Sequence, residues 1–403
     1  MAVESRQDQR AATPSGVPFW YDAKVRSIFY QIVAVLLFLA VVGYLTNNTI
    51  TNLEKRGIAT GFAFLRHPTG FGIAGTVGTN LVGYSESSTY ARAFMVGILN
   101  TLFVSVVGIF LATMVGFLLG VARLSSNWLI SKLATVYIEI IRNVPLLLQI
   151  LFWYFGVLTA LPRLKQSLEF RGAFFLNNRG LYSPRPIFES GAVAIAIAFA
   201  IGVVGTIVLA RWAKRRQELT GQRFPVFLSA LGLIIGLPVL ATLATGVPVT
   251  WEYPVLKGFN FQGGLVVIPE FMALLLALVA YTGAFIGEIV RAGIQSVSRG
   301  QTEAAHSLGV RPGPTLRLVI IPQALRVIIP PLTSQFLNLT KNSSLAAAIG
   351  YPELVAVFSG TVLNQTGQAV ECIALTMLVY FSISLCISLY MNWYNKRMAL
   401  VER

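Results

Sequence analysis

Two pairs of opposite charges stand beside long apolar segments, where a charged side chain needs a partner. Glu139 and Arg142 are three residues apart, and Glu288 and Arg291 repeat this spacing. Side chains at this spacing share one face of a helix, so each pair predicts an ion pair. Ionisable groups in such surroundings are costly and often functional. We interpret both pairs as contacts of an inner gate or of a cytoplasmic docking face.

A second polar group interrupts an apolar stretch near the C-terminal end of the sequence. Asn342, Ser343 and Ser344 follow one another, and Asn338 lies one helical turn earlier. A half helix beginning at Ser343 would present free backbone N–H groups, which bind anions. We therefore take Asn338, Asn342, Ser343 and Ser344 as a candidate pathway lining. The lone polar residues Asn100, Thr101 and Gln149 are interpreted more simply, as hydrogen bonds between helices.

A third feature is the long amphipathic stretch 288–326. Its centre predicts a short helix over Gln301–Leu308, followed by Gly309 in the position of a left-handed C-cap. Residues 310–314 predict a turn that leads back to an apolar segment. A short helix held away by such breaks has the shape of a lever, although an ordinary connecting loop fits the same residues. Its small apolar face contains Ala304, Ala305 and Leu308, beside Glu303 and His306.

The composition says what kind of molecule must position these residues. The 403 residues are 55% hydrophobic and only 12% charged, and the mean hydropathy is +0.69. Soluble domains carry about 25% charged residues, so a membrane environment is predicted. The 31 Lys and Arg against 16 Asp and Glu give a net charge of +15. Because the basic residues gather in short loops, we attribute them to cytoplasmic loops rather than to nucleic-acid binding.

The chain offers about eight apolar windows long enough to cross a bilayer. The seventh is short and contains Pro330 and Pro331, so we expect it to continue as a broken element over 343–362. The loop charges place both termini on the cytoplasmic side. The predicted windows are Ile28–Leu45, Phe94–Ala122, Val144–Leu161, Gly191–Ala210, Pro225–Ala244, Phe271–Gly287, Val327–Thr340 and Cys372–Met391.

These windows divide the chain into parts. Residues 46–93 and 162–190 would lie outside and fold either as small caps or as solvated linkers. The predicted organisation is a cytoplasmic tail (1–27), a first helix and outer loop (28–93), a first core part (94–161), an insertion with two extra helices (162–263), a second core part (264–395) containing 288–326, and a cytoplasmic tail (396–403).

Three windows carry a Gly-x-x-x-Gly pair, namely Gly116 with Gly120, Gly232 with Gly236, and Gly283 with Gly287. Such pairs allow close helix packing, which we favour over a moving hinge. The two histidines are too few and too distant for a metal site. Cys372 and Cys386 lie about 21 Å apart along one helix and cannot form a disulfide.

The stretch 288–326 resembles the EAA loop of ABC importer permeases. The resemblance rests on Glu303-Ala304-Ala305, Gly309 at the family spacing, and Pro322. Val319 and Ile321 stand where the family prefers Ile and Leu, a conservative departure. The resemblance extends to three further segments, YIEIIRNVPLLLQILFWYFG, PQALRVIIPPL and KNSSLAAAIGYPEL, which are similar to the polar amino-acid uptake family. The long outer and inserted segments resemble the long permeases of general L-amino-acid transporters.

This resemblance implies an all-α integral membrane protein with about eight transmembrane helices and a type I ABC importer permease core. It implies a transport subunit of the bacterial inner membrane, served by an ABC ATPase dimer, a periplasmic amino-acid-binding protein and a second related permease, more plausibly in a heterodimer than a homodimer. The ATPase-coupling residues carried over are Glu303, Ala304, Ala305, Leu308, Gly309 and Pro322.

The chain itself is expected to be non-catalytic and without cofactor or metal. No Gly-x-x-x-x-Gly-Lys-Ser/Thr phosphate loop occurs in the sequence, so ATP and Mg would be used by the partner ATPase. The candidate pathway would then receive an amino acid, with N–H donors for its carboxylate. An ion-coupled secondary transporter and a membrane scaffold or channel remain as alternatives, and the residues do not identify the amino acids carried.

Overall fold

The computed structural model describes residues 23–55, 57, 60–189, 192–222, 224–246 and 249–398. Most of the predicted N-terminal tail and the last residues of the C-terminal tail lie outside this part. Within it, 7 helices are long and apolar enough to cross a membrane, or up to 8 when one bent pair counts as a span. The predicted helical membrane fold is therefore confirmed.

The centre of the bundle is a close pair of helices, α3 (Tyr90–Arg123) and α9 (Pro269–Gln295). Glycines of each helix face the other, because a Cβ added at Gly120 would lie 2.7 Å from the carbonyl oxygen of Gly287, and one at Gly287 would lie 3.1 Å from Cβ of Leu119. Small residues let membrane helices approach until their backbones touch. The packing role predicted for these two Gly-x-x-x-Gly pairs is thus confirmed.

Two further helices, α12 (Ile321–Asn342) and α14 (Ala369–Met398), complete the bundle. Helix α12 packs against both α9 and α14, and Ile328 and Leu339 on α12 are buried with Leu274 and Leu278 on α9. Helix α12 passes through Pro330 and Pro331 without ending. The predicted break is found at Ser343, where α12 gives way to the 3₁₀-helix η7 (Ser343–Ile349).

The chain after η7 turns sharply and re-enters the bundle. Gly350 has a φ of 76°, which favours glycine, and the π-helix η8 (Val355–Val362) and the short α13 (Leu363–Thr366) follow. Asn100 of α3 fixes the turn, because its Nδ2 donates to the carbonyl of Pro352 at 2.7 Å and its Oδ1 accepts from the N–H of Gly78 at 2.9 Å. The broken element predicted over 343–362 is confirmed.

The third predicted span, Val144–Leu161, is helical over Leu146–Leu158, and a helix that was not predicted precedes it at an angle. Helix α4 (Trp128–Asn143) is followed by α5 (Leu146–Leu151) and the π-helix η3 (Phe152–Leu158), and the two arms meet at 104°. Pro145 causes the bend, since it lacks an N–H and disfavours a helical residue before it. Gln149 stabilises the corner by donating to the carbonyls of Ile141 and Val144, both at 2.9 Å.

The insertion begins with short strands rather than a linker. A four-stranded antiparallel sheet has the order β1-β2-β3-β8, and β4 pairs with β5 and β6 with β7. The strands are β1 (Leu168–Phe170), β2 (Phe174–Asn177), β3 (Gly180–Ser183), β4 (Arg185–Phe188), β5 (Val249–Glu252), β6 (Val255–Lys257), β7 (Asn260–Gln262) and β8 (Leu265–Val267). Of the two alternatives for residues 162–190, a folded cap is therefore observed.

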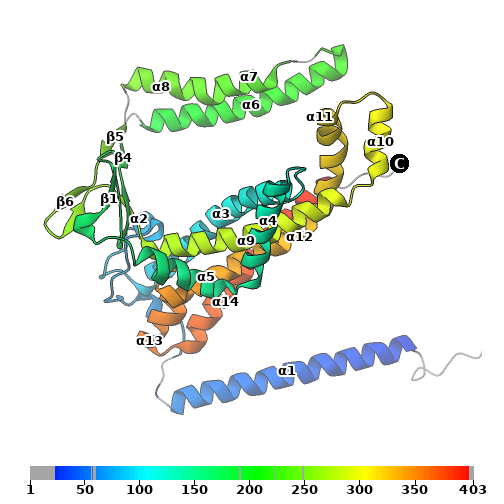
Figure 1. Cartoon of the computed structure of the whole chain (residues 1–403). Coiled ribbons are helices and arrows are strands. Elements are labelled where there is room, and N and C mark those ends of the chain that lie inside the picture. The colour runs from blue at the N-terminus through cyan, green and yellow to red at the C-terminus, as the bar shows by residue number, and fades with distance from the viewer. Residues whose placement is uncertain are drawn as a thin grey trace, which may run out of the picture.

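The strands carry a helical hairpin that stands apart from the bundle (Figure 1). Its arms are α6 (Ala192–Thr220) and the continuous α7 (Val226–Leu231), η5 (Gly232–Gly236) and α8 (Leu237–Thr245). A Cβ at Gly232 or Gly236 would meet no atom within 4 Å. This third Gly-x-x-x-Gly pair meets none of the described residues, contrary to the prediction. The first helix, α1 (Ala23–Lys55), is equally isolated.

The segment between α1 and α3 folds over one end of the bundle through η2 (Ala63–Arg66) and α2 (Val77–Val82). The hydroxyl of Tyr84 lies 2.9 Å from that of Thr69 and donates to the carbonyl of Phe71 at 2.8 Å. Burial raises the pKa of Tyr84, so this donor stays protonated. The N–H of Gly61 donates to Glu371 of α14 at 2.6 Å, so this segment is also a folded cap.

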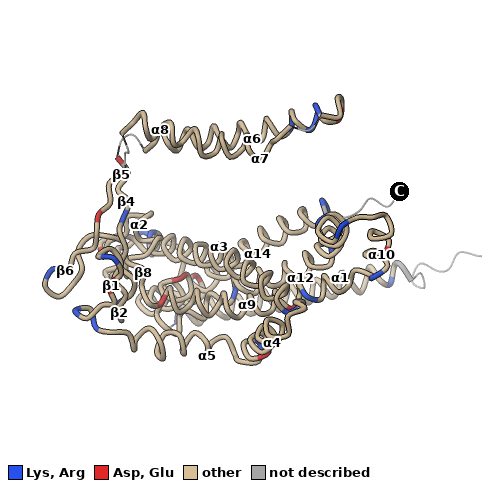
Figure 2. The backbone as a smooth tube through the Cα atoms, turned by 45° about the horizontal axis from the view of Figure 1, so that its top comes forward, with Lys and Arg blue, Asp and Glu red and all other residues tan. Residues whose placement is uncertain are grey.

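The molecule has two distinct ends. One holds the β-strands and the first turn of α9, and the other holds the start of α1, the last turns of α14 and the loop after α9 (Figure 1). Basic residues of the hairpin and of the loop after α9 lie at this second end (Figure 2). The loops predicted to be cytoplasmic thus share one end of the molecule.

Candidate coupling loop, ion-pair network and pathway

The predicted lever is present as helix α10 (Arg299–Ser307), which projects beyond the ends of α9 and α12 (Figure 1). It begins two residues earlier than expected, so Gly300 lies in its first turn rather than before it. Gly309 has a φ of 73°, as the predicted left-handed cap requires. The N–H of Val310 donates to the carbonyl of Ala305 at 3.1 Å, which closes the helix end.

The turn after α10 ends earlier than the predicted 310–314. Four residues, Leu308 to Arg311, separate α10 from α11 (Pro312–Thr315), which continues through the π-helix η6 (Leu316–Ile320) into α12. Proline fits the first turn of a helix because its missing N–H would have no partner there. Pro312 and Pro314 therefore start a helix here, where the sequence suggested that they end one. A continuous helical rod runs from the loop into the bundle.

The predicted coupling residues do not form a single apolar face. Ala305 is 7% exposed and faces the rod, whereas Leu308 is 83% exposed. Glu303 and Ala304 are exposed as well, and Pro322 is half-buried at the base of the rod. Gln301 is linked to Gln323 of α12 by a hydrogen bond of 3.3 Å. Ala305 thus anchors the helix, and Glu303, Ala304 and Leu308 face away from it.

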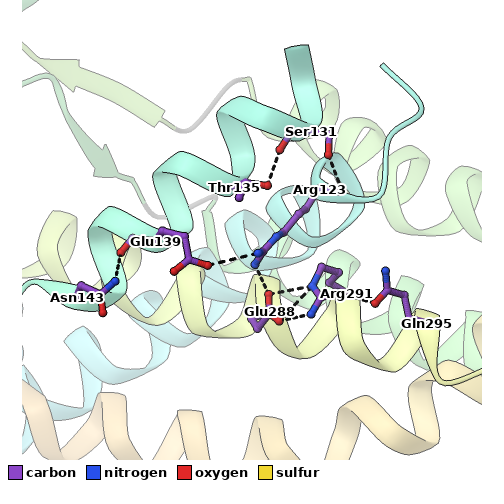
Figure 3. Close-up of polar contacts among 8 residues, drawn as sticks. All are labelled: Arg123, Ser131, Thr135, Glu139, Asn143, Glu288, Arg291 and Gln295. Carbon is purple, nitrogen blue, oxygen red and sulfur yellow. Dashed lines mark hydrogen bonds and ion pairs between the residues drawn. The ribbon is translucent and has the colours of Figure 1, made fainter. Parts of the chain in front are cut away.

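The predicted ion pairs lie together at the junction of α3, α4 and α9 (Figure 3). Arg291 donates from Nε to both carboxylate oxygens of Glu288, at 3.0 and 3.1 Å, so this predicted pair is confirmed. Arg123 at the end of α3 also binds Glu288 and reaches Glu139 of α4 at 3.3 Å. Glu288 is therefore bound by two arginines, and Arg123 joins three helices.

The pair predicted between Glu139 and Arg142 is wrong. Arg142 makes none of the ion pairs found in the described part of the chain. Its guanidinium lies 4.8 Å from the ring centroid of Phe285 on α9, a cation–π contact, and its Nε is buried without a hydrogen-bond partner. The three-residue spacing permits an ion pair between Glu139 and Arg142 within the helix. Arg123 instead binds Glu139 from the neighbouring helix, in the place predicted for Arg142.

The predicted pathway residues surround the end of α12 without forming one pocket. Ser344 and Lys341 line a cavity of about 490 Å³ with Thr376, Tyr380 and Ser384 of α14. Ser343 is fully buried, and its hydroxyl donates to the carbonyl of Thr340 at 2.7 Å. Asn338 is exposed and Asn342 half-buried. Of the four candidates, only Ser344 lines this cavity.

The half helix expected to begin at Ser343 begins elsewhere. The N–H of Ser343 donates to the carbonyl of Leu339. Ser343 therefore caps the end of α12, and its N–H is not a free donor. The new helix begins after Glu353, whose carboxylate accepts from the N–H groups of Val355 and Ala356 at 2.8 and 2.7 Å. An acidic residue at such a helix start satisfies the donors that would otherwise be free.

Three residues of these sites were not among the predicted ones. Arg123 directly follows the apolar window Phe94–Ala122, where a basic residue indicates only a loop charge. Glu353 is fully buried and accepts from the hydroxyl of Tyr380 at 2.9 Å. The spacing Tyr351-Pro352-Glu353 before an apolar run is a helix-start signal that can be found in the sequence. Tyr380 gave no signal, because aromatic residues are common in membrane helices.

Comparison with known proteins places this geometry in a family. The family described as binding-protein-dependent transport system inner membrane component matches residues 108–400. The general L-amino acid transport system permease protein AapQ of Rhizobium johnstonii is 55% identical over 383 residues, covering 95% of this chain and 94% of the relative. The family match includes α3 from Gly108 onward, the whole of α9 and the whole loop with α10.

Two other relatives match over similar lengths. The putative amino-acid ABC transporter permease protein YhdX of Escherichia coli is 55% identical, covering 98% of this chain and 99% of the relative. The glutamate/glutamine/aspartate/asparagine transport system permease protein BztB of Rhodobacter capsulatus is 45% identical, covering 95% and 96%. The chain belongs to the family of inner membrane components of binding-protein-dependent transport systems.

Proposed function

We propose that this chain is the permease subunit of an ATP-binding-cassette importer that takes up L-amino acids delivered by a periplasmic binding protein. The main support for this proposal is helix α10, which projects from the helix bundle of a chain that permeases of amino-acid transport systems match over almost its whole length. The chain forms half of the translocation pathway. A second, related permease supplies the other half.

The coupling helix works as a rigid lever. Its exposed residues Glu303, Ala304 and Leu308 dock into a groove of a separate ATPase, while Ala305 and Gly309 hold the helix in position. Because the rod through Pro322 is continuous with α12, a push on α10 reaches the bundle directly. ATP and Mg are bound by the ATPase dimer, and this chain carries out no hydrolysis.

The charge network at the junction of α3, α4 and α9 keeps these helices moving together. Arg123 binds carboxylates on two other helices, so moving α3 away from α4 and α9 breaks both of these ion pairs. Arg142, held against Phe285, is the candidate gate residue that has no ionic partner here. We assign this cluster to the inner gate.

Amino acid passes beside the end of α12. Ser344 and Lys341, which line the cavity against α14, are the best-placed groups of the predicted pathway. Asn338 and Asn342 lie on the same helix and would face the partner permease. Replacing Asn342 and Ser344 by apolar residues should lower uptake and leave assembly intact, whereas unchanged uptake contradicts this pathway.

The orientation follows from the two ends of the molecule. The end with α10 faces the cytoplasm with both termini, and the β-strands face the periplasm. A reporter enzyme fused near Arg179, between β2 and β3, should then behave as exported. A cytoplasmic signal from that fusion contradicts the proposed topology.

Co-purification tests the coupling function. A complex extracted with a tagged wild-type chain should retain an ATPase, and the double variant Glu303→Ala, Gly309→Val should lose it. The matched control is Glu218→Ala with Gly221→Val, which alters an acidic residue and a left-handed glycine after α6 instead. Retention of the ATPase by the α10 variant contradicts the proposal.

A further inference from the structure

A second cavity, of about 390 Å³, lies at the opposite end of the bundle from α10. Five parts of the chain line it: the outer segment at Thr76 and Asn80, α3 at Phe103, the turn at Tyr351, the strands of the insertion, and the first turn of α9 at Phe271. The insertion contributes Arg185 of β4 and residues 264–267 of β8. Small-ligand sites occupy roughly 300–1,000 Å³, so this cavity suits one small metabolite.

The cavity carries a single formal charge. Arg185 is the one charged residue among its lining residues, and it takes part in none of the ion pairs of the described chain. A guanidinium matches a carboxylate with two parallel hydrogen bonds. Because no acidic side chain lines the cavity, a ligand with a carboxylate is favoured over a purely cationic one.

The floor of the cavity is aromatic and has one free polar group. The rings of Phe103 and Phe271 stack with centroids 5.4 Å apart, and Tyr351 lies 5.8 Å from Phe271. Tyr351 lines the cavity and is only 1% exposed overall, and none of the side-chain hydrogen bonds of the described residues involves its hydroxyl. A phenolic hydroxyl can donate or accept, so it offers a hydrogen bond to a ligand in the cavity.

We propose that this cavity is a binding site for a free α-amino acid, with Arg185 bound to the ligand carboxylate and Tyr351 and the aromatic floor facing its ammonium group. An ammonium over an aromatic face is attracted by the ring. The identity of the ligand rests on the proposed function. The site goes beyond the permease core, because Arg185 and β8 come from the strands that carry the hairpin.

The insertion thus completes a reception site at the outer end of the bundle. An amino acid released there would be held before it enters the pathway beside α12. The turn at Tyr351 connects the two places, since Glu353 begins the re-entrant helix η8 two residues later and Val355 lines the cavity beside Ser344.

Direct binding tests the site. The full complex in nanodiscs, without binding protein and without ATP, is titrated with tritiated L-glutamine. Wild type should bind it, and unlabelled L-glutamine should compete while its α-amide, which lacks the carboxylate, should not. Arg185→Gln should weaken binding roughly tenfold or more, and Tyr351→Phe about threefold. The matched control, Arg171→Gln on the same set of strands but outside the cavity, should bind as wild type.

The outcomes separate this site from the proposed function. Equal binding by wild type and Arg185→Gln overturns the site, as does the absence of wild-type binding at millimolar probe. Loss of binding-protein docking in Arg185→Gln with normal L-glutamine binding also overturns it, because Arg185 would then serve a protein partner. ATP-driven uptake by the same wild-type preparation is measured alongside, and its absence contradicts the proposed function instead.

Discussion

The helix pair α3 and α9 and the hairpin of α6 with α7–α8 are equally apolar, yet they are used in opposite ways. In the pair, glycines meet backbone and β-carbons of the other helix, and buried polar groups and arginines join neighbouring elements. In the hairpin, Gly232 and Gly236 face open space, and the ion pair Lys214–Glu218 is 3.9 Å long and largely exposed. Hydropathy alone therefore does not separate the transport core from its periphery.

The largest expected effect comes from matched glycine substitutions. Gly120→Val places side-chain atoms against the backbone of Gly287, which cannot move away, at a cost of roughly 3 kcal/mol or more. Gly236→Val meets no neighbour and should change stability by less than about 0.5 kcal/mol. Thermal inactivation of the detergent-solubilised complex measures both. Similar losses in the two variants would contradict the comparison.

The second-largest loss of stability is expected from removing a buried polar side chain. Asn100→Ala removes the hydrogen bonds that join α3 to α2 and to the turn before η8. The N–H of Gly78 and the carbonyl of Pro352 are left unsatisfied, which costs on the order of 2–3 kcal/mol. Its control in the hairpin is Thr206→Ala, which removes only a bond to the carbonyl of Gly202 in its own helix. Hydrogen exchange at η8 should rise in the first variant only. Equal exchange in both would show that Asn100 does not hold the turn.

The ion pairs should differ by a smaller amount. Glu288→Gln leaves Arg123 and Arg291 close together without their shared carboxylate, at a cost of about 1–2 kcal/mol. Glu218→Gln in the hairpin removes an exposed pair of little value. The rate of ATP-driven uptake should fall severalfold for the first and stay unchanged for the second. An unchanged rate for Glu288→Gln would remove the network from the gate.

The smallest effect should follow from removing the hairpin itself. Replacing residues 192–246 by a short glycine-serine linker leaves the β4–β5 pairing at its base. Co-purification of the ATPase should then remain at the wild-type level, because α10 packs against α11 and η6 of its own loop. Loss of the ATPase would show that the hairpin belongs to the core.

The sequence predicted best what depends on local geometry or strong composition. Gly309 at the end of α10, the glycines of the central pair and the broken element after α12 were all found from spacing and hydropathy. The errors involve distant partners. Arg123 is 165 residues from Glu288, and nothing in the short spacing of Glu139 and Arg142 reveals that Arg123 takes the carboxylate.

A proline signal was read with the wrong sign in one place. Pro312 and Pro314 start a helix where a turn was predicted, and Pro145 marks a bend between α4 and α5 that the predicted window Val144–Leu161 did not include. The choice between these outcomes depends on whether neighbouring groups donate hydrogen bonds to the carbonyls that proline frees, as Gln149 does at the bend. The cavity at Arg185 could not be predicted, because its lining comes from five separate parts of the chain.

ATP-driven uptake in a defined system tests the central claim most directly. Proteoliposomes containing this chain with its partner permease and ATPase, supplied with the binding protein outside and labelled L-amino acid, are compared with and without ATP inside. The account predicts accumulation only with ATP, lost when Glu303 and Gly309 are both replaced. Accumulation by this chain alone in ATP-free liposomes would contradict it and favour an ion-coupled transporter.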